Sequence, residues 1–127
     1  MKDRRVEIRP IIKISSEGEY VSFSERFQNQ TLRPIIKLQH NLLIAVFKSK
    51  AKSKKLILKN ISDQKLIKFI DDLLFKDPNF RPLIIGLITG HFTVDEFNQY
   101  EEYSSEINKR IIAIIDERLI NSLKELK

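Results

Sequence analysis

The spacing of the apolar residues constrains the fold of this chain more than any other feature. From residue 32 to residue 126, apolar side chains recur every three or four positions, in stretches separated by prolines and helix-capping residues. Such spacing places them on one face of an α-helix. Because 127 residues make about one domain, the sequence predicts a single all-α domain over residues 1–127, an irregular antiparallel four-helix bundle.

Capping residues mark where helices begin. Ser22 and Glu25 have the spacing of a capping box, in which each side chain accepts a hydrogen bond from a backbone amide at the helix start. Thr93 and Glu96 repeat that spacing, and Ser62 stands before another apolar stretch. From these caps and the apolar stripes we predict helices over residues 22–50, 62–76, 78–89 and 93–126.

Some residues predict irregularities in these helices. Pro34 lacks an amide donor and crowds the carbonyl of Gln30, so we expect either a kink there or a restart of the helix with Thr31 as its cap. Gly90 is placed to end the helix over residues 78–89 in a left-handed conformation. Ser104 and Ser105 indicate a bend or a break in the last helix.

The N-terminal residues 1–21 show no helical period and are predicted to form an extended arm and a turn. Pro10 interrupts this segment, and several of its apolar residues share one parity, which favours an extended strand-like arm laid over the core. These residues are Val6, Ile8, Ile12 and Ile14.

The composition excludes several classes of protein. The chain has no cysteine, which rules out a disulfide framework, a thiolate zinc site, an iron–sulfur cluster and a cysteine nucleophile. The longest apolar runs are too short to cross a bilayer, and the N-terminus does not have the pattern of a signal peptide. We therefore expect a cytoplasmic protein without a membrane span.

No motif for catalysis or metal binding stands out. The two histidines, His40 and His91, are not spaced as a metal-binding pair. Adjacent carboxylates such as Asp71 and Asp72 point about 100° apart on a helix, so we do not expect them to act as an acid and base pair. We predict no catalytic residue, no metal site and no cofactor.

The net charge of +6 is distributed unevenly. Residues 1–60 hold 14 Lys and Arg against 5 Asp and Glu, whereas residues 93–106 form an acidic segment. One interpretation of the densest basic run is binding of nucleic acid or anionic lipid through phosphates. The interpretation we favour is a solvated connection that keeps the protein soluble. The basic and the acidic segments are then two opposite charge poles, which suit self-association and a foreign partner equally well. The run consists of Lys48, Lys50, Lys52, Lys54, Lys55 and Lys59.

Four polar residues fall within the apolar stripes. Gln28 and Gln39 lie on the face predicted to be buried in the first long helix, and Asn108 and Arg118 on that of the last. Because an unpaired buried polar group costs a few kcal/mol, they should meet one another, the backbone or a ligand. One interpretation is a pocket for a small anion or substrate with Arg118 as its anchor. The alternative is that Arg118 reaches water, while the glutamines cap the kinked backbone at Pro34.

Three segments together resemble a family of small bacterial helical proteins, some of which carry the label glyoxalase. They are residues 27–39 (FQNQTLRPIIKLQ), residues 86–93 (GLITGHFT) followed by Glu96, and residues 108–118 (NKRIIAIIDER). The label implies a metal-dependent lyase built from βαβββ modules, a pattern from which this sequence departs, so no catalytic residue is transferred. The resemblance also implies one framework made of Gln28, Asn29, Thr31, Arg33, Pro34, Gln39, Gly90, Thr93, Asn108 and Arg118.

The apolar residues of the last predicted helix cover about half of its circumference, which is wide enough to contact more than one neighbour. We therefore expect a non-enzymatic interaction module that self-associates or binds a protein partner. The alternatives are a small-ligand binder or enzyme that uses the region around Arg118, and nucleic-acid binding through residues 48–59.

Overall fold

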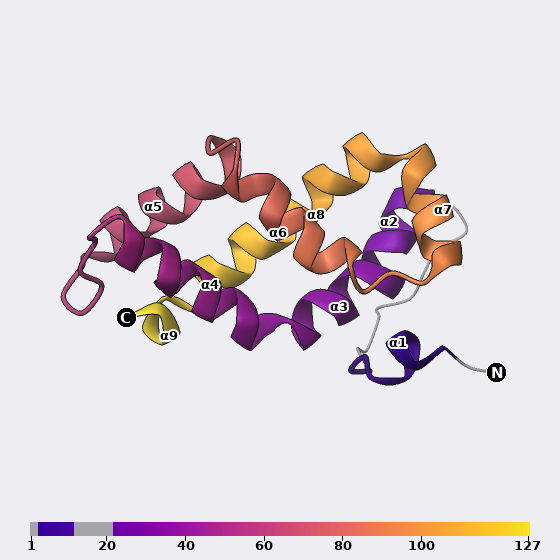
Figure 1. The fold of residues 1–127 in the computed structure, drawn as a ribbon, viewed down its shortest axis with the longest axis horizontal. Helices are drawn as coiled ribbons and strands as arrows, with labels where there is room; N and C mark the ends of the chain where they lie inside the picture. The colour runs from indigo at the N-terminus through magenta and orange to yellow at the C-terminus, as the bar shows by residue number, and fades with distance from the viewer. Residues whose placement is uncertain (1–2, 12–21) are drawn as a thin grey trace.

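The computed structural model describes residues 3–11 and 22–127 of the chain. Within these ranges every regular element is helical and no residue belongs to a β-strand, which confirms the all-α fold class. The first and the last predicted helices are both interrupted, so the elements are shorter than a simple four-helix bundle requires. Their bounds (Figure 1) are α1 Arg4–Glu7, α2 Phe23–Phe27, η1 Gln28–Leu32, α3 Arg33–Leu38, α4 His40–Ser53, α5 Asp63–Phe75, α6 Phe80–Thr89, α7 Val94–Glu102, α8 Ser104–Ile120 and α9 Leu123–Leu126.

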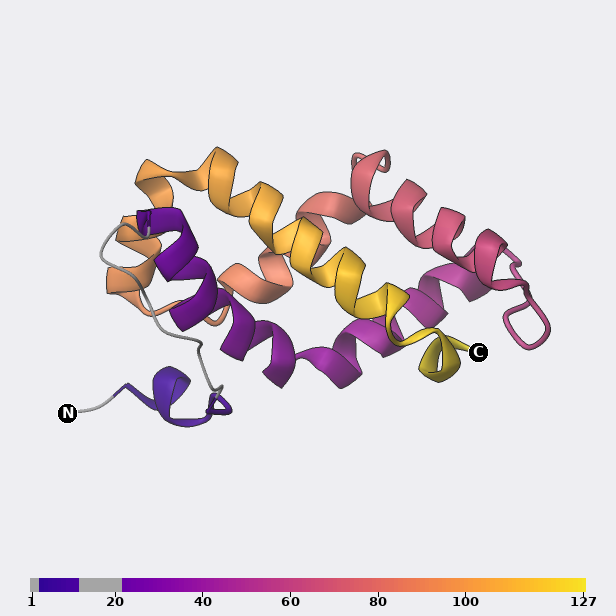
Figure 2. The same ribbon diagram turned by 180° about the vertical axis from the view of Figure 1, so that it is seen from behind.

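Helix α8 is the central element. Figure 2 shows it running between the α2–α4 segment and the α5–α6 pair, and it contacts α5, α6, α7 and η1. Burying one large aliphatic side chain contributes about 1.5–3 kcal/mol, and α8 buries five of them completely. Its wide apolar face is therefore covered within one chain. The five are Ile107, Ile111, Ile112, Ile115 and Leu119.

The first predicted helix contains a wide turn and then a break. Residues Gln28–Leu32 form the π-helical turn η1, after which the N–H of Arg33 donates to the carbonyl of Gln28, five residues earlier. This wider turn leaves room for the ring of Pro34, which in a regular helix would crowd the carbonyl four residues before it. The distortion at Pro34 is therefore the wide turn before it, and the helix does not restart with Thr31 as its cap, because Thr31 lies inside η1 and α3 follows directly. A separate break follows at Gln39 (φ −88°, ψ 6°).

Helix α4 continues beyond its predicted end at residue 50, to Ser53. Lys55 then adopts a left-handed conformation (φ 58°), and the N–H of Leu56 donates to the carbonyl of Ala51 at 2.9 Å. This is the hydrogen bond of a Schellman motif, in which glycine usually occupies the left-handed position.

The left-handed stop predicted at Gly90 is wrong. Gly90 has right-handed helical dihedrals (φ −62°, ψ −15°), and its N–H donates to the carbonyl of Gly86 at 2.9 Å. The chain leaves α6 by continuing the helical turn instead of reversing it. A side chain at Gly90 would meet a steric limit, since an added Cβ would lie 3.1 Å from the oxygen of Gly86.

The prediction of an extended N-terminal arm is wrong for residues Arg4–Glu7. Asp3 caps a short helix there by accepting a hydrogen bond from the N–H of Arg5 at 2.8 Å. The cap favours a helical turn over the extended strand that the alternating apolar residues predict. One of these residues, Ile8, is largely exposed. The predicted turn at Ser15–Tyr20 and the arm residues Ile12 and Ile14 lie outside the described residues.

The other helix boundaries follow the sequence closely. The predicted caps at Ser22, Ser62 and Thr93 each accept the N–H three residues later, and at Thr93 both halves of the capping box are present. Helix α6 begins at Phe80, two residues later than predicted, and no side chain caps it at Asn79. In the turn before it, Asp77 Oδ1 accepts the amides of residues 79 and 80. The break in the last predicted helix occurs at residue 103 (φ −129°, ψ 27°), directly before the two serines.

None of the helices in the described part of the chain combines the length and the apolar character needed to cross a membrane.

Candidate functional site

Two of the four polar residues predicted to form a pocket have partners near the N-terminal half of α8. Gln28 Oε1 accepts a hydrogen bond from Arg110 Nη1 at 2.8 Å. Asn108 Oδ1 accepts one from the hydroxyl of Tyr100 at 2.7 Å. Both side chains are thus engaged in separate contacts that join η1 and α7 to α8.

The third residue, Gln39, crosses to α6. Its Nε2 donates to the carbonyl of Leu87 at 3.1 Å. One interpretation of the sequence expected the glutamines to hydrogen-bond backbone groups, and Gln39 does so. Its acceptor, however, is a carbonyl of α6 and not the kinked backbone at Pro34.

The fourth residue, Arg118, contacts a histidine that the sequence left unassigned. Arg118 Nε donates to His40 Nδ1 at 3.1 Å, and His40 Nε2 lies 3.0 Å from the carboxylate of Glu125. Because Nδ1 accepts, the imidazole proton is on Nε2 and is donated to Glu125. The pKa of Glu125 is lowered, first by this hydrogen bond and also by the charge of Arg118. The hollow that Arg118 lines contains none of the other three polar residues.

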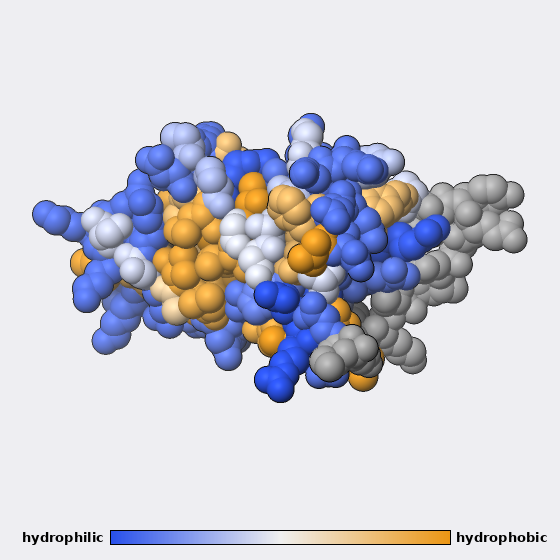
Figure 3. All heavy atoms as spheres, turned by 45° about the vertical axis from the view of Figure 1, so that its right-hand side comes forward, coloured by the Kyte–Doolittle hydropathy of each residue, from blue (hydrophilic) through white to orange (hydrophobic). Residues whose placement is uncertain are grey.

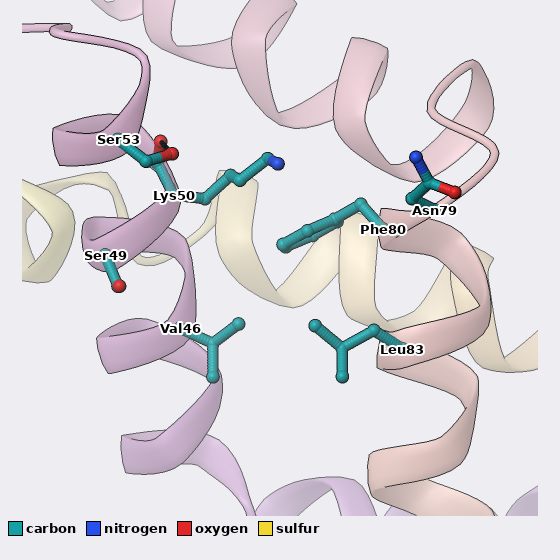
Figure 4. Close-up of a pocket in the computed structure, with 7 residues that line it drawn as sticks. All are labelled: Val46, Ser49, Lys50, Ser53, Asn79, Phe80 and Leu83. Atoms are coloured by element: carbon teal, nitrogen blue, oxygen red, sulfur yellow. Dashed lines mark hydrogen bonds between the residues drawn. The ribbon is translucent and has the colours of Figure 1, made fainter.

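An apolar groove lies between α4 and α6. It encloses about 430 Å³, and Figure 4 shows Val46 and Leu83 facing each other across it, with Lys50 pointing toward Phe80. Phe80 is buried at its floor, whereas Leu83 is 52% exposed. Lys50 Nζ lies 6.0 Å from the centre of the Phe80 ring, at the outer limit of a cation–π contact. The remaining lining residues are Ser49, Ser53 and Asn79.

Beyond the residues that line the groove, each of its two helices carries a further leucine on the same side. Val46 faces Leu83, and one turn earlier on α4 the exposed Leu42 occupies the same side of the helix. On α6 the corresponding position is the half-buried Leu87, to whose carbonyl Gln39 is bound. The space-filling view shows an apolar area on this side of the molecule, with neutral residues beside it and hydrophilic residues around them (Figure 3).

Lys50 is the residue of the lysine run that lines this groove. The pKa of Asp77 is lowered, first by hydrogen bonds from the amides of Phe80 and Asn79, and also by the charges of Lys50 and Lys54. Both lysines therefore lie close to the start of α6. The other four lysines are exposed on the end of α4 and on the turns after it, and no carboxylate within the described ranges forms an ion pair with them: Lys48, Lys52, Lys55 and Lys59.

Helix α7 presents the opposite charge. None of its residues is buried, and Val94 and Phe97 are 76% and 45% exposed. The exposed Glu101 lies on the same helix face, since positions 94, 97 and 101 are three and seven residues apart. This acidic, partly apolar helix packs against α8 at the end of the molecule away from α9 (Figure 1).

Glu96 is the α7 carboxylate that turns inward. Arg9 donates to it through both Nη atoms, at 2.7 Å and 2.8 Å, and also to the carbonyl of His91 at 2.7 Å. Burial raises the pKa of Glu96, but the hydrogen bonds from Arg9, from the N–H of Thr93 and from the Thr31 hydroxyl outweigh it, so the pKa lies below its usual value. The sequence indicates the contact with Thr93, but no local signal identifies Arg9 as a partner.

A carboxyl pair lies between α5 and α8. Burial, and then the neighbouring Asp71 carboxyl, raise the pKa of Asp116 to about 7. The Oδ1 atoms of both residues are buried. The sequence shows each aspartate only beside another carboxylate on its own helix, and their proximity depends on the packing of α5 against α8.

The comparisons with known proteins assign no family to the chain. No protein-family model matches it, and no match was found among curated proteins or solved structures. The βαβββ architecture that accompanies the glyoxalase label does not describe the helical residues 22–127, and in the described ranges no group of three or more metal-binding side chains converges. The resemblance to small bacterial helical proteins stays a prediction.

Proposed function

We propose that this chain is a self-associating interaction module, in which the α4–α6 groove of one copy binds helix α7 of the next copy. The observation that carries the proposal is the groove, an apolar hollow in which Leu83 is largely exposed beside a basic margin. An exposed apolar area with polar edges is typical of a protein interaction site.

The shape of the groove suits a helix. An amphipathic helix binds between two helices by inserting apolar anchors spaced three or four residues apart. Val46 and Leu83 supply the walls and Phe80 the floor for such an anchor. The volume of about 430 Å³ falls within the usual range of about 300–1,000 Å³ for binding pockets.

Helix α7 has the matching chemistry. Val94 and Phe97 are exposed at the required spacing, and Glu101 follows them on the same face. Lys50 lines the groove next to the apolar residues, and Lys54 lies near the start of α6, so both lysines offer the opposite charge. Apolar anchoring supplies the affinity, and the charges steer the encounter and fix the direction of the bound helix.

The two surfaces are different, so the contact is head-to-tail. The groove belongs to α4 and α6, whereas α7 packs at the far end of α8 (Figure 1). A head-to-tail contact leaves one free groove and one free helix at the ends of every open assembly. We therefore expect oligomers that grow with concentration, or a closed ring.

Light scattering coupled to size-exclusion chromatography tests the proposal. The mass of the wild type should rise with concentration across the micromolar range, and the rise should be weaker at high salt because the charges are screened. A wild-type mass that equals one chain throughout this range would rule the proposal out.

Two variants identify the surfaces. Leu83→Asp should block the groove and Phe97→Asp should block the helix, so each variant alone should remain monomeric. An equimolar mixture should form a dimer of defined size, because Phe97→Asp retains its groove and Leu83→Asp retains its α7. Ile57→Asp is the matched control, since Ile57 is 79% exposed and belongs to neither surface. If Leu83→Asp abolishes association but Phe97→Asp does not, the groove binds another segment and the role of α7 is wrong.

A further inference from the structure

A second hollow, between α3 and α8, is lined almost entirely by cations and aliphatic side chains. It encloses about 290 Å³ and is formed by Arg33, Ile36 and Lys37 of α3 with Ile114 and Arg118 of α8. Three of these five residues are positively charged, and none is acidic. The hollow is independent of the α4–α6 groove, because the two share no residue.

Both arginines are held through the same atom. Arg33 Nε donates to Asn29 Oδ1 at 3.2 Å, and Arg118 Nε donates to His40 Nδ1 at 3.1 Å. These bonds fix the planes of the guanidinium groups and leave their terminal nitrogens for another acceptor. No carboxylate in residues 3–11 and 22–127 forms an ion pair with Arg33, Lys37 or Arg118.

The nearest acids lie at the margins. Glu125 is separated from Arg118 by the imidazole of His40. Glu106 and Glu117 line the adjoining hollow, which shares Arg33 and Ile114 with this one, and Glu106 is paired with Arg110 at 3.3 Å. No carboxylate lines the hollow itself, and Glu125 at its margin offsets only part of the repulsion among the three cations. An anion between them would remove the rest of that repulsion.

We propose that this hollow binds a phosphate group, either as inorganic phosphate or as a small phosphomonoester. Guanidinium forks match the oxygen geometry of phosphate, and a lysine adds a point charge. Ile36 is buried beneath the cations, Arg118 is half-buried, and Arg33 and Lys37 are exposed, so an anion can reach all three from solvent. The volume lies below the usual range for drug-sized ligands, about 300–1,000 Å³, which favours a small anion.

The proposal modifies the pocket expected from the sequence. Arg118 remains the anchor, but Gln28, Gln39 and Asn108 are bound elsewhere, and Arg33 and Lys37 take their place. Arg33 and Lys37 are one helical turn apart, so both project from the same side of α3 toward α8.

Titration of the ¹⁵N-labelled full chain, followed by NMR, tests the site. Inorganic phosphate and glycerol phosphate are added in parallel, with potassium chloride at matched ionic strength as the blank. Saturable shifts should appear in the amides of α3 and in the last two turns of α8. Tighter binding of glycerol phosphate would identify the ester as the better ligand, and tighter binding of phosphate would identify the free ion. Shifts that do not saturate, or that the chloride blank reproduces, overturn the proposal.

Substitutions locate the contacts. Arg118→Gln and Lys37→Gln should each raise the Kd for phosphate by roughly tenfold or more, the usual effect of losing a charge-assisted hydrogen bond. Lys37→Gln guards against misfolding, because it removes no bond within the described fold. Lys48→Gln removes the same charge outside the hollow and should leave the Kd unchanged. Equal weakening by Lys48→Gln would show a general charge effect and refute the site. Leu83→Asp should bind phosphate like the wild type, which separates this test from that of self-association.

Discussion

The guanidinium of Arg9 and the carboxylate of Glu96 form two parallel hydrogen bonds, at 2.7 Å and 2.8 Å, across 87 positions of the chain. Only 6% of the Arg9 side chain is exposed. The same carboxylate closes the capping box of α7 by accepting the N–H of Thr93 at 2.8 Å. One side chain therefore both starts α7 and attaches it to the segment after α1.

Arg9→Gln should lower the free energy of unfolding by about 2–4 kcal/mol at neutral pH, because it leaves a half-buried carboxylate without its charged partner. Urea denaturation at neutral pH measures the loss. Arg5→Gln is the control, since the pair of Arg5 with Asp3 is exposed, has a separation of 3.5 Å and should contribute almost nothing. Equal losses in both variants would show that the Arg9 contact carries no special weight.

The contribution of this pair should disappear in acid. The pKa of Glu96 in the folded state lies below its usual value of 4.5, so the stabilisation is complete above that pH and is lost as the pH falls through the lower, folded value. The difference in unfolding free energy between the wild type and Arg9→Gln should therefore shrink below pH 4.5. A difference that stays constant into strong acid would mean that the Arg9 contact is not electrostatic.

Asp116→Asn should stabilise the protein at pH 8. The pKa of Asp116 is raised from 3.8 to about 7, so between these values the folded state holds a proton that the unfolded state has released. Stability from this group therefore falls as the pH rises from 3.8 to about 7. Because the carboxyl is partly exposed, solvent screening reduces the gain to the order of 1 kcal/mol. Thermal unfolding at pH 4 and pH 8 measures it.

Asp72→Asn is the matched control for that prediction. Hydrogen bonding to Lys76 and the charge of Lys68 lower the pKa of Asp72, so this exposed carboxylate stabilises above its ordinary pKa of 3.8 and the effect is lost in acid. The two variants should therefore shift the melting temperature at pH 8 in opposite directions. A shift of the same sign in both would contradict the assignment of Asp116.

Lys55→Gly should raise stability by about 1 kcal/mol, because lysine pays a steric cost in the left-handed conformation that glycine avoids. The observation is the φ of 58° at Lys55. Lys54→Gly is the control, since Lys54 has a φ of −91° and glycine there only adds flexibility to the unfolded chain. Denaturant midpoints should move upward for Lys55→Gly and downward for Lys54→Gly. A decrease in both would indicate that the side chain of Lys55 matters more than its backbone.

Two glycines one helical turn apart should respond differently to alanine. Gly86→Ala should stabilise by about 1 kcal/mol, the difference in helix propensity, since an added Cβ meets nothing within 4 Å. Gly90→Ala should bring no gain, because its Cβ would lie 3.1 Å from the oxygen of Gly86. Thermal unfolding of the two variants provides the comparison, and an equal gain in both would show that the contact at Gly90 relaxes freely.

The features that the sequence predicted well are local ones. The capping box of Thr93 and Glu96 lies within four residues, and its hydrogen bonds form wherever the helix starts. Ser62 is equally local. The π-helical turn before Pro34 was harder to foresee, because the same proline is compatible with a kink, a restart or a wider turn, and the packing of η1 against α8 is part of the choice.

The candidate site depends on contacts between distant residues. Leu83 belongs to an apolar stripe that looks like core, and only the relative positions of α4 and α6 leave it exposed. Arg9 and Glu96, or Asp71 and Asp116, become neighbours only through tertiary packing. The apolar periodicity determines which helix face is buried, but it does not determine which helix covers it.

The order of synthesis gives α8 a further role. The helices from α2 to α6 leave the ribosome before α8, and their apolar faces have no permanent cover until Ile107 and the isoleucines after it arrive. A nascent chain that stalls before Ser104 would expose the apolar faces that α8 covers in the folded protein, and chaperones bind such exposed apolar surface. The hydrophobic core therefore becomes complete late in translation, once α8 has been synthesised and packs against the earlier helices.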